Sequence, residues 1–182
     1  MENYKKNLEL LTKNHVYSKE MEHDACGVGL IASTEGKKSR AVVEYGIEAL
    51  KAVWHRGAVD ADGKTGDGAG IHVEIPKDFF IEKIEVTGHD YDNTEICVGM
   101  IFLPRNDYSA QESCKTIVES ELTKNNFSIY GWRQVPVNPK VLGEKALQTM
   151  PEIIQVLFKS NDPNLLDKSL ERKIYETRKK IE

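Results

Sequence analysis

The predicted fold class depends mainly on one stretch of the chain, Glu22-His23-Asp24-Ala25-Cys26-Gly27-Val28-Gly29-Leu30-Ile31-Ala32. Cys26 opens an apolar run in which small glycines alternate with larger side chains, a pattern typical of a strand buried on both faces. The 25 residues before Cys26 are mostly polar, with four lysines and five acidic residues. A cysteine that starts a buried strand after such a leader indicates a nucleophile that becomes the first residue of the mature chain. We therefore predict that residues 1–25 are a propeptide.

Length, charge and cysteine usage restrict the class of protein. With 182 residues the chain is long enough for one domain, and 30% charged and 40% hydrophobic residues are typical of a soluble globular protein. A net charge of -4 argues against a general nucleic-acid binder. No run approaches the roughly 18 apolar residues of a membrane span, and the leader lacks a secretory signal's apolar core. We expect a cytoplasmic protein with no membrane partner, whose three cysteines stay reduced.

Hydrophobic periodicity predicts alternating strands and helices along the rest of the chain. Ser39 is positioned to cap a helix that Gly57 would end, and Ser109 with Glu112 predicts a capping box at the start of another. Further helices are expected over 78–84, 141–149 and 169–182, and strands over 26–33, 70–75, 96–103, 128–137 and 153–159. The last of these helices reaches residue 182 without a stop signal, which indicates that the sequence is a fragment.

The run from Gly57 to Gly70 contains closely spaced glycines and aspartates that invite a ligand-binding interpretation. A phosphate-binding loop is excluded, because Ala58 stands where that motif requires glycine. A calcium loop starting at Asp60 would need an acidic or amide residue where Lys64 stands. Tight turns between a helix and a strand are therefore the favoured interpretation, with the aspartates solvated or capping turns.

The histidines and cysteines are the remaining candidates for metal binding or catalysis. The five histidines show neither HxxxH nor HExxH spacing, so no metal site is predicted. Cys97 and Cys114 lie within apolar patterns and are expected to fill core space. By pattern alone, Cys26 fits equally well a small residue that merely opens a buried strand, so both interpretations are open at this point. A lipoprotein cleavage site is excluded, because no apolar segment precedes Cys26.

Three motifs favour the nucleophile interpretation when they are taken together. They are Asp-Ala-Cys-Gly-Val-Gly at 24–29, His-Arg-Gly-Ala at 55–58 and Asp-Gly-Lys-Thr-Gly-Asp-Gly-Ala-Gly at 62–70. This set resembles the class II glutamine amidotransferase domain of glutamate synthase large subunits. Similar stretches at 98–103 and 131–136 extend the resemblance over essentially all of residues 22–182.

The resemblance implies an α+β fold of the N-terminal nucleophile type. This fold is a four-layer αββα sandwich, incomplete in this chain, of which residues 26–182 form the N-terminal part. The resemblance also implies that the Cys26 thiolate attacks the side-chain amide of glutamine, with Arg56 and Gly57 supporting the site. A free α-amine, with a pKa of roughly 7.7 to 8.0, is able to take the thiol proton, so residues 1–25 would keep the site inactive until they are removed.

Further implications concern the parent enzyme. Its ammonia would travel to a distant site that makes glutamate from 2-oxoglutarate with FMN and an iron-sulfur cluster, and neither group has a motif in this chain. The expected partners are the remainder of the large subunit and a small subunit. The family's arginine motif and Asn-Gly oxyanion pair do not occur before Glu182, so we expect this chain alone to hydrolyse glutamine poorly. Two alternatives are another N-terminal nucleophile hydrolase and a non-catalytic interaction or assembly domain that retains the fold.

Overall fold

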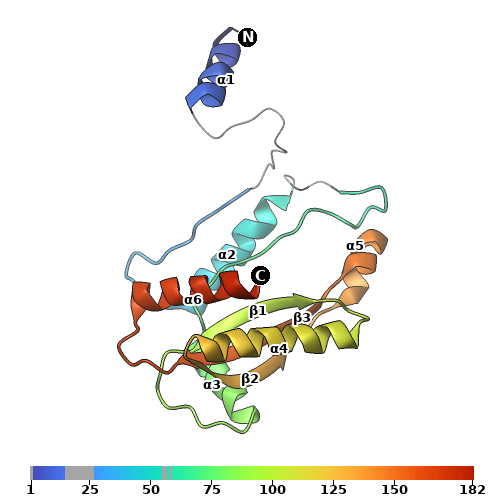
Figure 1. The fold of residues 1–182 in the computed structure, drawn as a ribbon. Helices are drawn as coiled ribbons and strands as arrows, with labels where there is room; N and C mark the ends of the chain where they lie inside the picture. Colours follow the sequence, from blue (N-terminus) through green and yellow to red (C-terminus); the bar gives the residue numbers. More distant parts are fainter. Residues whose placement is uncertain (1, 15–26, 55–56, 58) are drawn as a thin grey trace. The chain divides into compact units, whose positions relative to one another are not determined.

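A computed structural model describes residues 2–14, 27–54, 57 and 59–182 of the chain. The chain divides into two compact units, Met1–Gly57 and Ala58–Glu182, and each is described by itself. In the first unit, helix α1 spans Glu2–Asn14 and helix α2 spans Arg40–Ala52 (Figure 1). Every helix among the described residues is too short or too polar to cross a bilayer.

The second unit is built around an antiparallel sheet of three strands. Strand β3 (Glu152–Ser160) lies in the centre, between β1 (Cys97–Leu103) and β2 (Phe127–Gln134). The register places Gly99 of β1 opposite Val156 of β3. A Cβ at Gly99 would lie only 2.8 Å from a Val156 methyl carbon, so glycine makes room for the larger side chain of the central strand.

Helices pack on both faces of this sheet. Helices α4 (Tyr108–Lys124) and α6 (Asp167–Ile181) bury their apolar residues on one face, with α4 in front of the strands in Figure 1. Helix α3 (Lys77–Val86) packs on the other face. The 3-10 turn η2 (Pro139–Val141) and helix α5 (Glu144–Thr149) connect β2 to β3. The first core consists of Cys97, Val118, Leu122, Phe127, Val156, Phe158 and Leu170, and the second of Phe80, Ile84, Ile96, Tyr130 and Leu157.

Most elements of the second unit follow the predicted pattern. The strands expected over 96–103, 128–137 and 153–159 are β1, β2 and β3, and the helices expected over 78–84 and 169–182 are α3 and α6. The periodicity predicts that Cys114, Ile117, Val118 and Leu122 face inward on helix α4, and this is confirmed for Val118 and Leu122, whereas Ile117 is exposed and Cys114 is half-buried. The mixture of helices and an antiparallel sheet confirms the α+β class.

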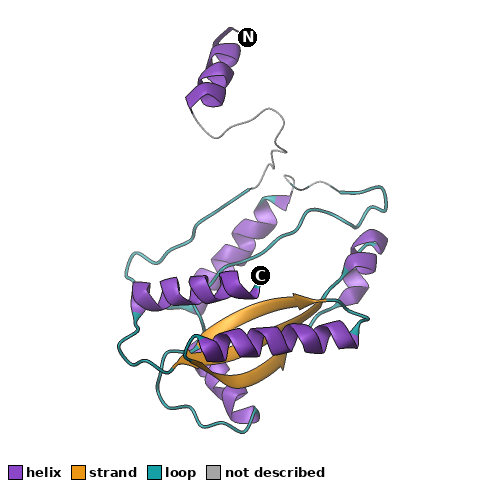
Figure 2. Cartoon of the chain, in the orientation of Figure 1, coloured by secondary structure: helices purple, strands orange, loops and turns teal. Residues whose placement is uncertain are grey.

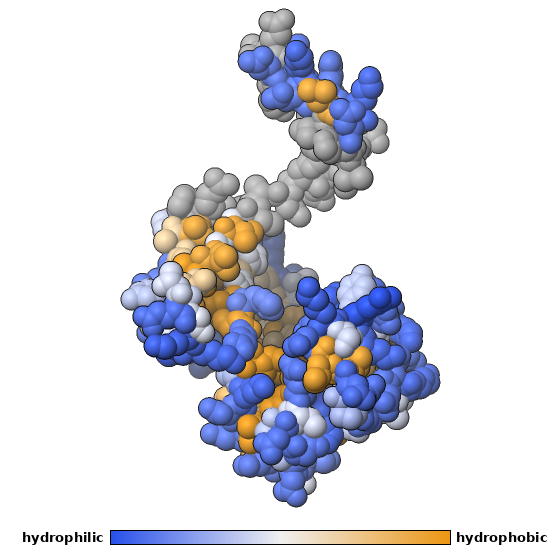
Figure 3. All heavy atoms as spheres, turned by 90° about the vertical axis from the view of Figure 1, so that its left-hand side faces the viewer, coloured by the Kyte–Doolittle hydropathy of each residue, from blue (hydrophilic) through white to orange (hydrophobic). Residues whose placement is uncertain are grey.

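Two predicted strands are wrong. Residues 27–33 and 70–75 form no strand and are drawn as loop in Figure 2. Val28 is 92% exposed and Leu30 is 88% exposed, and such hydrophobic side chains appear as orange atoms on the surface in Figure 3. A strand exists only through hydrogen bonds to a neighbouring strand, and neither segment pairs with one among the described residues. The apolar pattern therefore predicted burial correctly only where a pairing partner is present.

Two predicted helix boundaries also differ from the structure. Helix α4 is capped by Asp107, whose side chain accepts a hydrogen bond from the Ala110 amide at 2.9 Å, in place of the predicted Ser109–Glu112 capping box. Aspartate caps helices at least as well as serine, so the earlier residue begins the helix. Helix α2 ends at Ala52, before Gly57, and none of its residues is buried, so packing does not hold a further turn in place.

Candidate functional site

The structure describes only part of the predicted catalytic site. Cys26 and Arg56 lie outside the described residues, so their predicted roles stay predictions. Gly57 is described and exposed, and its amide donates a hydrogen bond to the Trp54 carbonyl at 3.1 Å. A Cβ at Gly57 would lie 3.3 Å from that carbonyl oxygen, which fits a close turn at this glycine.

The second part of the glycine-rich motif forms a closed loop, which we call the 59–66 loop. Val59 and Gly66 make an antiparallel bridge, and the Asp60 amide donates to the Thr65 carbonyl at 2.7 Å. At the tip, Gly63 adopts a φ of 68°, a left-handed conformation that glycine tolerates without steric cost. The predicted tight turn is confirmed here.

Asp62 is the hydrogen-bonding centre of the 59–66 loop. One carboxylate oxygen accepts from the Lys64 and Thr65 amides at 2.9 and 2.7 Å, and the other accepts from the Thr65 hydroxyl at 2.5 Å. These bonds, the Thr65 hydroxyl first, hold the pKa of the Asp62 carboxyl well below its usual range, and the Glu144 amide contributes in the same direction. The expectation that these aspartates cap turns is confirmed at Asp62.

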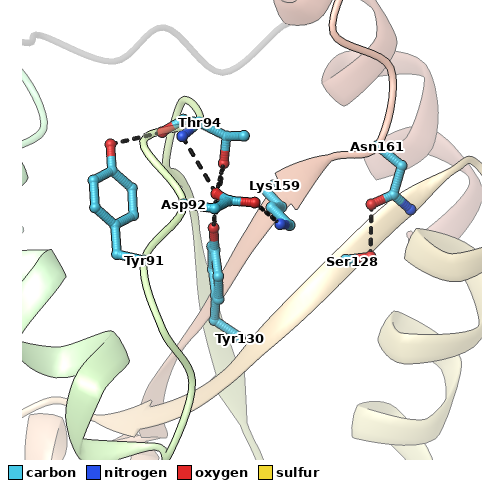
Figure 4. Close-up of polar contacts among 7 residues, drawn as sticks. All are labelled: Tyr91, Asp92, Thr94, Ser128, Tyr130, Lys159 and Asn161. Atoms are coloured by element: carbon cyan, nitrogen blue, oxygen red, sulfur yellow. Dashed lines mark hydrogen bonds and ion pairs between the residues drawn. The ribbon is translucent and has the colours of Figure 1, made fainter.

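A second polar cluster joins the loop after α3 to the sheet (Figure 4). Asp92 accepts hydrogen bonds from the Thr94 hydroxyl at 2.7 Å and from the Tyr130 hydroxyl at 2.9 Å, and it pairs with the Lys159 ammonium group. Tyr130 comes from β2 and Lys159 from β3, so one carboxylate fastens a loop to two neighbouring strands. We call these four residues the Asp92 cluster.

The electrostatics of the Asp92 cluster indicate a structural clamp. The Lys159 ammonium group, followed by the Thr94 hydroxyl, lowers the pKa of Asp92, while Asp92 raises the pKa of Lys159. Burial raises the pKa of the Tyr130 phenol. All three shifts favour the charged pair and the neutral phenol at neutral pH, so the cluster offers no ready base or nucleophile. The pattern of the sequence carries no signal for it, because Asp92, Tyr130 and Lys159 are separated by long stretches of chain.

A surface cavity of about 460 Å³ lies between the start of α4 and the ends of β2 and β3. Its charged lining includes Arg105, Lys115, Arg133 and Glu152. Arg133 donates to the Gln155 side chain at 2.7 Å, and Glu152 accepts from Gln134. These two charged side chains of the lining therefore already have hydrogen-bond partners within the protein. None of the described residues of the predicted site lines this cavity, and the described residues hold no group of three His, Cys, Asp or Glu side chains that suits a metal ion.

Comparison with known proteins identifies the family. The profile of the family described as "Glutamine amidotransferases class-II" matches residues 26–182. The chain belongs to this family. The resemblance drawn from the three motifs is thereby confirmed. This class II glutamine amidotransferase chain contains the predicted nucleophile Cys26 at the first residue of the match.

Curated relatives of this amidotransferase chain are glutamate synthases. It is 52% identical over 179 residues to the glutamate synthase [NADPH] large chain of Azospirillum brasilense. The aligned region covers 98% of this chain and 12% of the relative. It is 41% identical over 162 residues to ferredoxin-dependent glutamate synthase 1 of Arabidopsis thaliana, covering 88% of this chain and 10% of the relative. The ferredoxin-dependent glutamate synthase of Pyropia yezoensis is 40% identical over 174 residues. The chain thus spans about a tenth of the length of these relatives.

Proposed function

We propose that this chain carries the nucleophile of the glutamine-hydrolysing site of a glutamate synthase. The Cys26 thiolate attacks the side-chain amide carbon of glutamine, and the proton that the α-amine took from the thiol passes to the amide nitrogen, so that the C–N bond breaks and ammonia leaves. Water then hydrolyses the thioester to glutamate and regenerates the thiol. The observation that carries the proposal is the family match, which covers 26–182 and begins at Cys26 itself.

The proposed role of the leader follows from proton transfer. The amine of an N-terminal Cys26 would accept the thiol proton near neutral pH, because an α-amino group has a pKa of roughly 7.7 to 8.0, whereas a peptide nitrogen accepts none. We expect residues 1–25 to block the site until they are cut off. Intact-mass measurement of the enzyme from its native host should show a chain that begins at Cys26. A fully active enzyme that still carries the leader would overturn this part of the proposal.

The rest of the site is proposed from motif position. Arg56 and Gly57 would support glutamine binding beside Cys26. The 182 residues contain no Asn-Gly pair for an oxyanion hole, and loss of one oxyanion donor costs on the order of a hundredfold to a thousandfold in turnover. We therefore expect a polypeptide of these 182 residues alone to hydrolyse glutamine far more slowly than the parent enzyme.

The sheet supports the proposal of a four-layer αββα sandwich. By the alternation of side chains along β1, Met100 and Phe102 point to the same face as Val98, which packs in the α3 core. Met100 is 51% exposed and Phe102 is 62% exposed, so α3 leaves part of this face uncovered. We infer that a second sheet packs there in the parent enzyme.

The parent enzyme would use the released ammonia to make glutamate from 2-oxoglutarate in the cytoplasm, with FMN and an iron-sulfur cluster. Iron-sulfur clusters are held by several cysteine thiolates, and the three cysteines of this chain form no CxxC pair. The residues of this chain therefore do not fit an iron-sulfur cluster, and we propose that the cluster and the FMN are bound by the remainder of the large subunit or by a small subunit. Of the relatives, one is named for NADPH and others are named as ferredoxin-dependent.

The substitution Cys26→Ala in the parent enzyme tests the proposal. Glutaminase activity should fall by at least about a thousandfold, because no other group supplies the nucleophile. The matched control is Cys114→Ala, a half-buried cysteine on α4 that should leave glutamine hydrolysis unchanged. Glutamine hydrolysis that persists in Cys26→Ala would refute the proposed function.

A further inference from the structure

The cavity at the start of α4 has the size of a small-molecule site. Its volume of about 460 Å³ lies within the range of roughly 300 to 1,000 Å³ that is usual for ligand pockets. Its lining residues all belong to the second unit. The half-buried Trp132 of β2 lines it, and the indole N–H donates to the Glu119 carboxylate at 2.7 Å, which fixes the orientation of the ring. A small ligand therefore has a preformed aromatic side chain to pack against.

Two opposite charges line the cavity at the same end of the sheet. Leu103 of β1 lies opposite Glu152 of β3 in the register, and Arg105 follows Leu103 by two positions. Arg105 and Glu152 both line the cavity. The antiparallel pairing of β1 with β3 thus brings a guanidinium group and a carboxylate from distant parts of the chain to one surface depression.

Among the described residues, Arg105 and Glu152 each have a neutral hydrogen-bond partner and no ion pair. Arg105 donates to the Met150 sulfur at 3.7 Å, and a thioether is a weak acceptor. Glu152 accepts from the side-chain amide of Gln134. Hydrogen bonds between charged groups are roughly twice as strong as those between neutral groups. The cavity therefore offers one place for an anionic group and one for a cationic group.

A second positive charge comes from Lys115 of α4. Its side chain is 29% exposed and pairs with Glu112 at 2.8 Å, whereas the Glu112 side chain is 73% exposed. An ion pair with so exposed a partner contributes little, so a ligand carboxylate in the cavity would compete for the ammonium group. Arg133 is engaged elsewhere, because its guanidinium group lies 5.1 Å from the centre of the Phe79 ring of α3.

We propose that this cavity binds an α-amino acid with an acidic side chain. The α-carboxylate pairs with Arg105, the α-ammonium group pairs with Glu152, and the side-chain carboxylate pairs with Lys115. The three charges of such a ligand are opposite in sign to the three side chains that receive them. The inference goes beyond the proposed function and does not depend on it, because it stands on the cavity alone.

Hydrogen exchange in the parent enzyme tests binding, with L-glutamate as the probe. The backbone amides of residues 105–107, which lie at the cavity, should exchange at least about fivefold more slowly at saturating glutamate, because a bound ligand stabilises the loop that holds Arg105. Exchange that does not change at about 10 mM glutamate would overturn the proposal. Complete protection of these amides before glutamate is added would also overturn it, since another part of the parent enzyme would then fill the cavity.

Two analogues of glutamate test which charges are recognised. Glutarate lacks the ammonium group, and γ-aminobutyrate lacks the α-carboxylate. Each should bind at least about tenfold more weakly than glutamate, because one charged hydrogen bond is lost. In Glu152→Gln, which keeps an oxygen acceptor for Gln134, the preference for glutamate over glutarate should vanish. In Arg105→Met, the preference for glutamate over γ-aminobutyrate should vanish.

Arg172→Met is the matched control, at an arginine of α6 that pairs with Glu176 and does not line the cavity. It should bind the three probes as the wild type does. Survival of the corresponding preference in either Glu152→Gln or Arg105→Met would overturn the proposal. The readout requires no glutaminase activity, so an enzyme without that activity would remove the proposed function and leave the amino-acid site to be judged by exchange.

Discussion

At the scale of single residues, Cys97 has a structural role in the core of the second unit. Burial raises the pKa of the Cys97 thiol to about 12, and the charges of Glu95 and Glu171 add to the shift. A thiol with this pKa is protonated at neutral pH and behaves as a small apolar side chain in the core. The prediction that Cys97 fills core space is confirmed, whereas Cys114, for which the same was expected, is only half-buried on α4 and belongs to neither core.

The Asp92 cluster predicts a specific acid dependence of stability. Because the folded-state pKa of Asp92 lies below its ordinary value of 3.8, its contribution is complete above that value and is lost as the pH falls through the folded pKa. The substitution Asp92→Asn should therefore destabilise the chain near neutral pH, by no more than about 1 kcal/mol for a solvent-accessible pair. Urea unfolding at about pH 7 and at about pH 3 measures the difference between wild type and variant. A difference that is equally large at both values would contradict this account.

At the scale of elements, sequence periodicity predicted what depends on local pattern and missed what depends on distant partners. Strands β1, β2 and β3 contain long apolar runs and pair with one another, so pattern and structure agree. Residues 27–33 carry a similar pattern but pair with no strand among the described residues. The contact of Gly143 with Asp62 and the Asp92 cluster join residues far apart in sequence, and no local pattern encodes such contacts. Asp62 itself was recognisable as a turn-capping residue.

The start of α4 gives a test of capping at this scale. Asp107 accepts from the Ala110 amide, so Asp107→Ala should lower the free energy of unfolding by about 1 kcal/mol. Ser109→Ala is the control, because the Ser109 side chain is not the cap, and it should change stability by less than about 0.5 kcal/mol. Denaturant unfolding of both variants provides the comparison. A larger loss of unfolding free energy in Ser109→Ala than in Asp107→Ala would instead support the predicted Ser109–Glu112 capping box.

At the scale of the whole molecule, we expect the exposed sheet face to be covered in the parent enzyme. A thiol introduced by Phe102→Cys should react rapidly with a water-soluble reagent in the 182-residue chain, where Phe102 is 62% exposed. In the parent enzyme the same thiol should react at least about tenfold more slowly, because a second sheet would bury it. Tyr108→Cys, at a position that is 77% exposed on α4, is the control for general access to reagent. Equal rates at position 102 in both proteins would contradict the four-layer arrangement.

The central claim is that Cys26 is the nucleophile of a glutamine-hydrolysing site, and covalent labelling tests it most directly. The parent enzyme, after removal of residues 1–25, is treated with an electrophilic glutamine analogue and its peptides are analysed by mass spectrometry. We expect one adduct on Cys26, prevented by excess glutamine, and no adduct on Cys97, whose raised pKa keeps the thiol protonated. An unlabelled Cys26 in an enzyme that hydrolyses glutamine would contradict the claim.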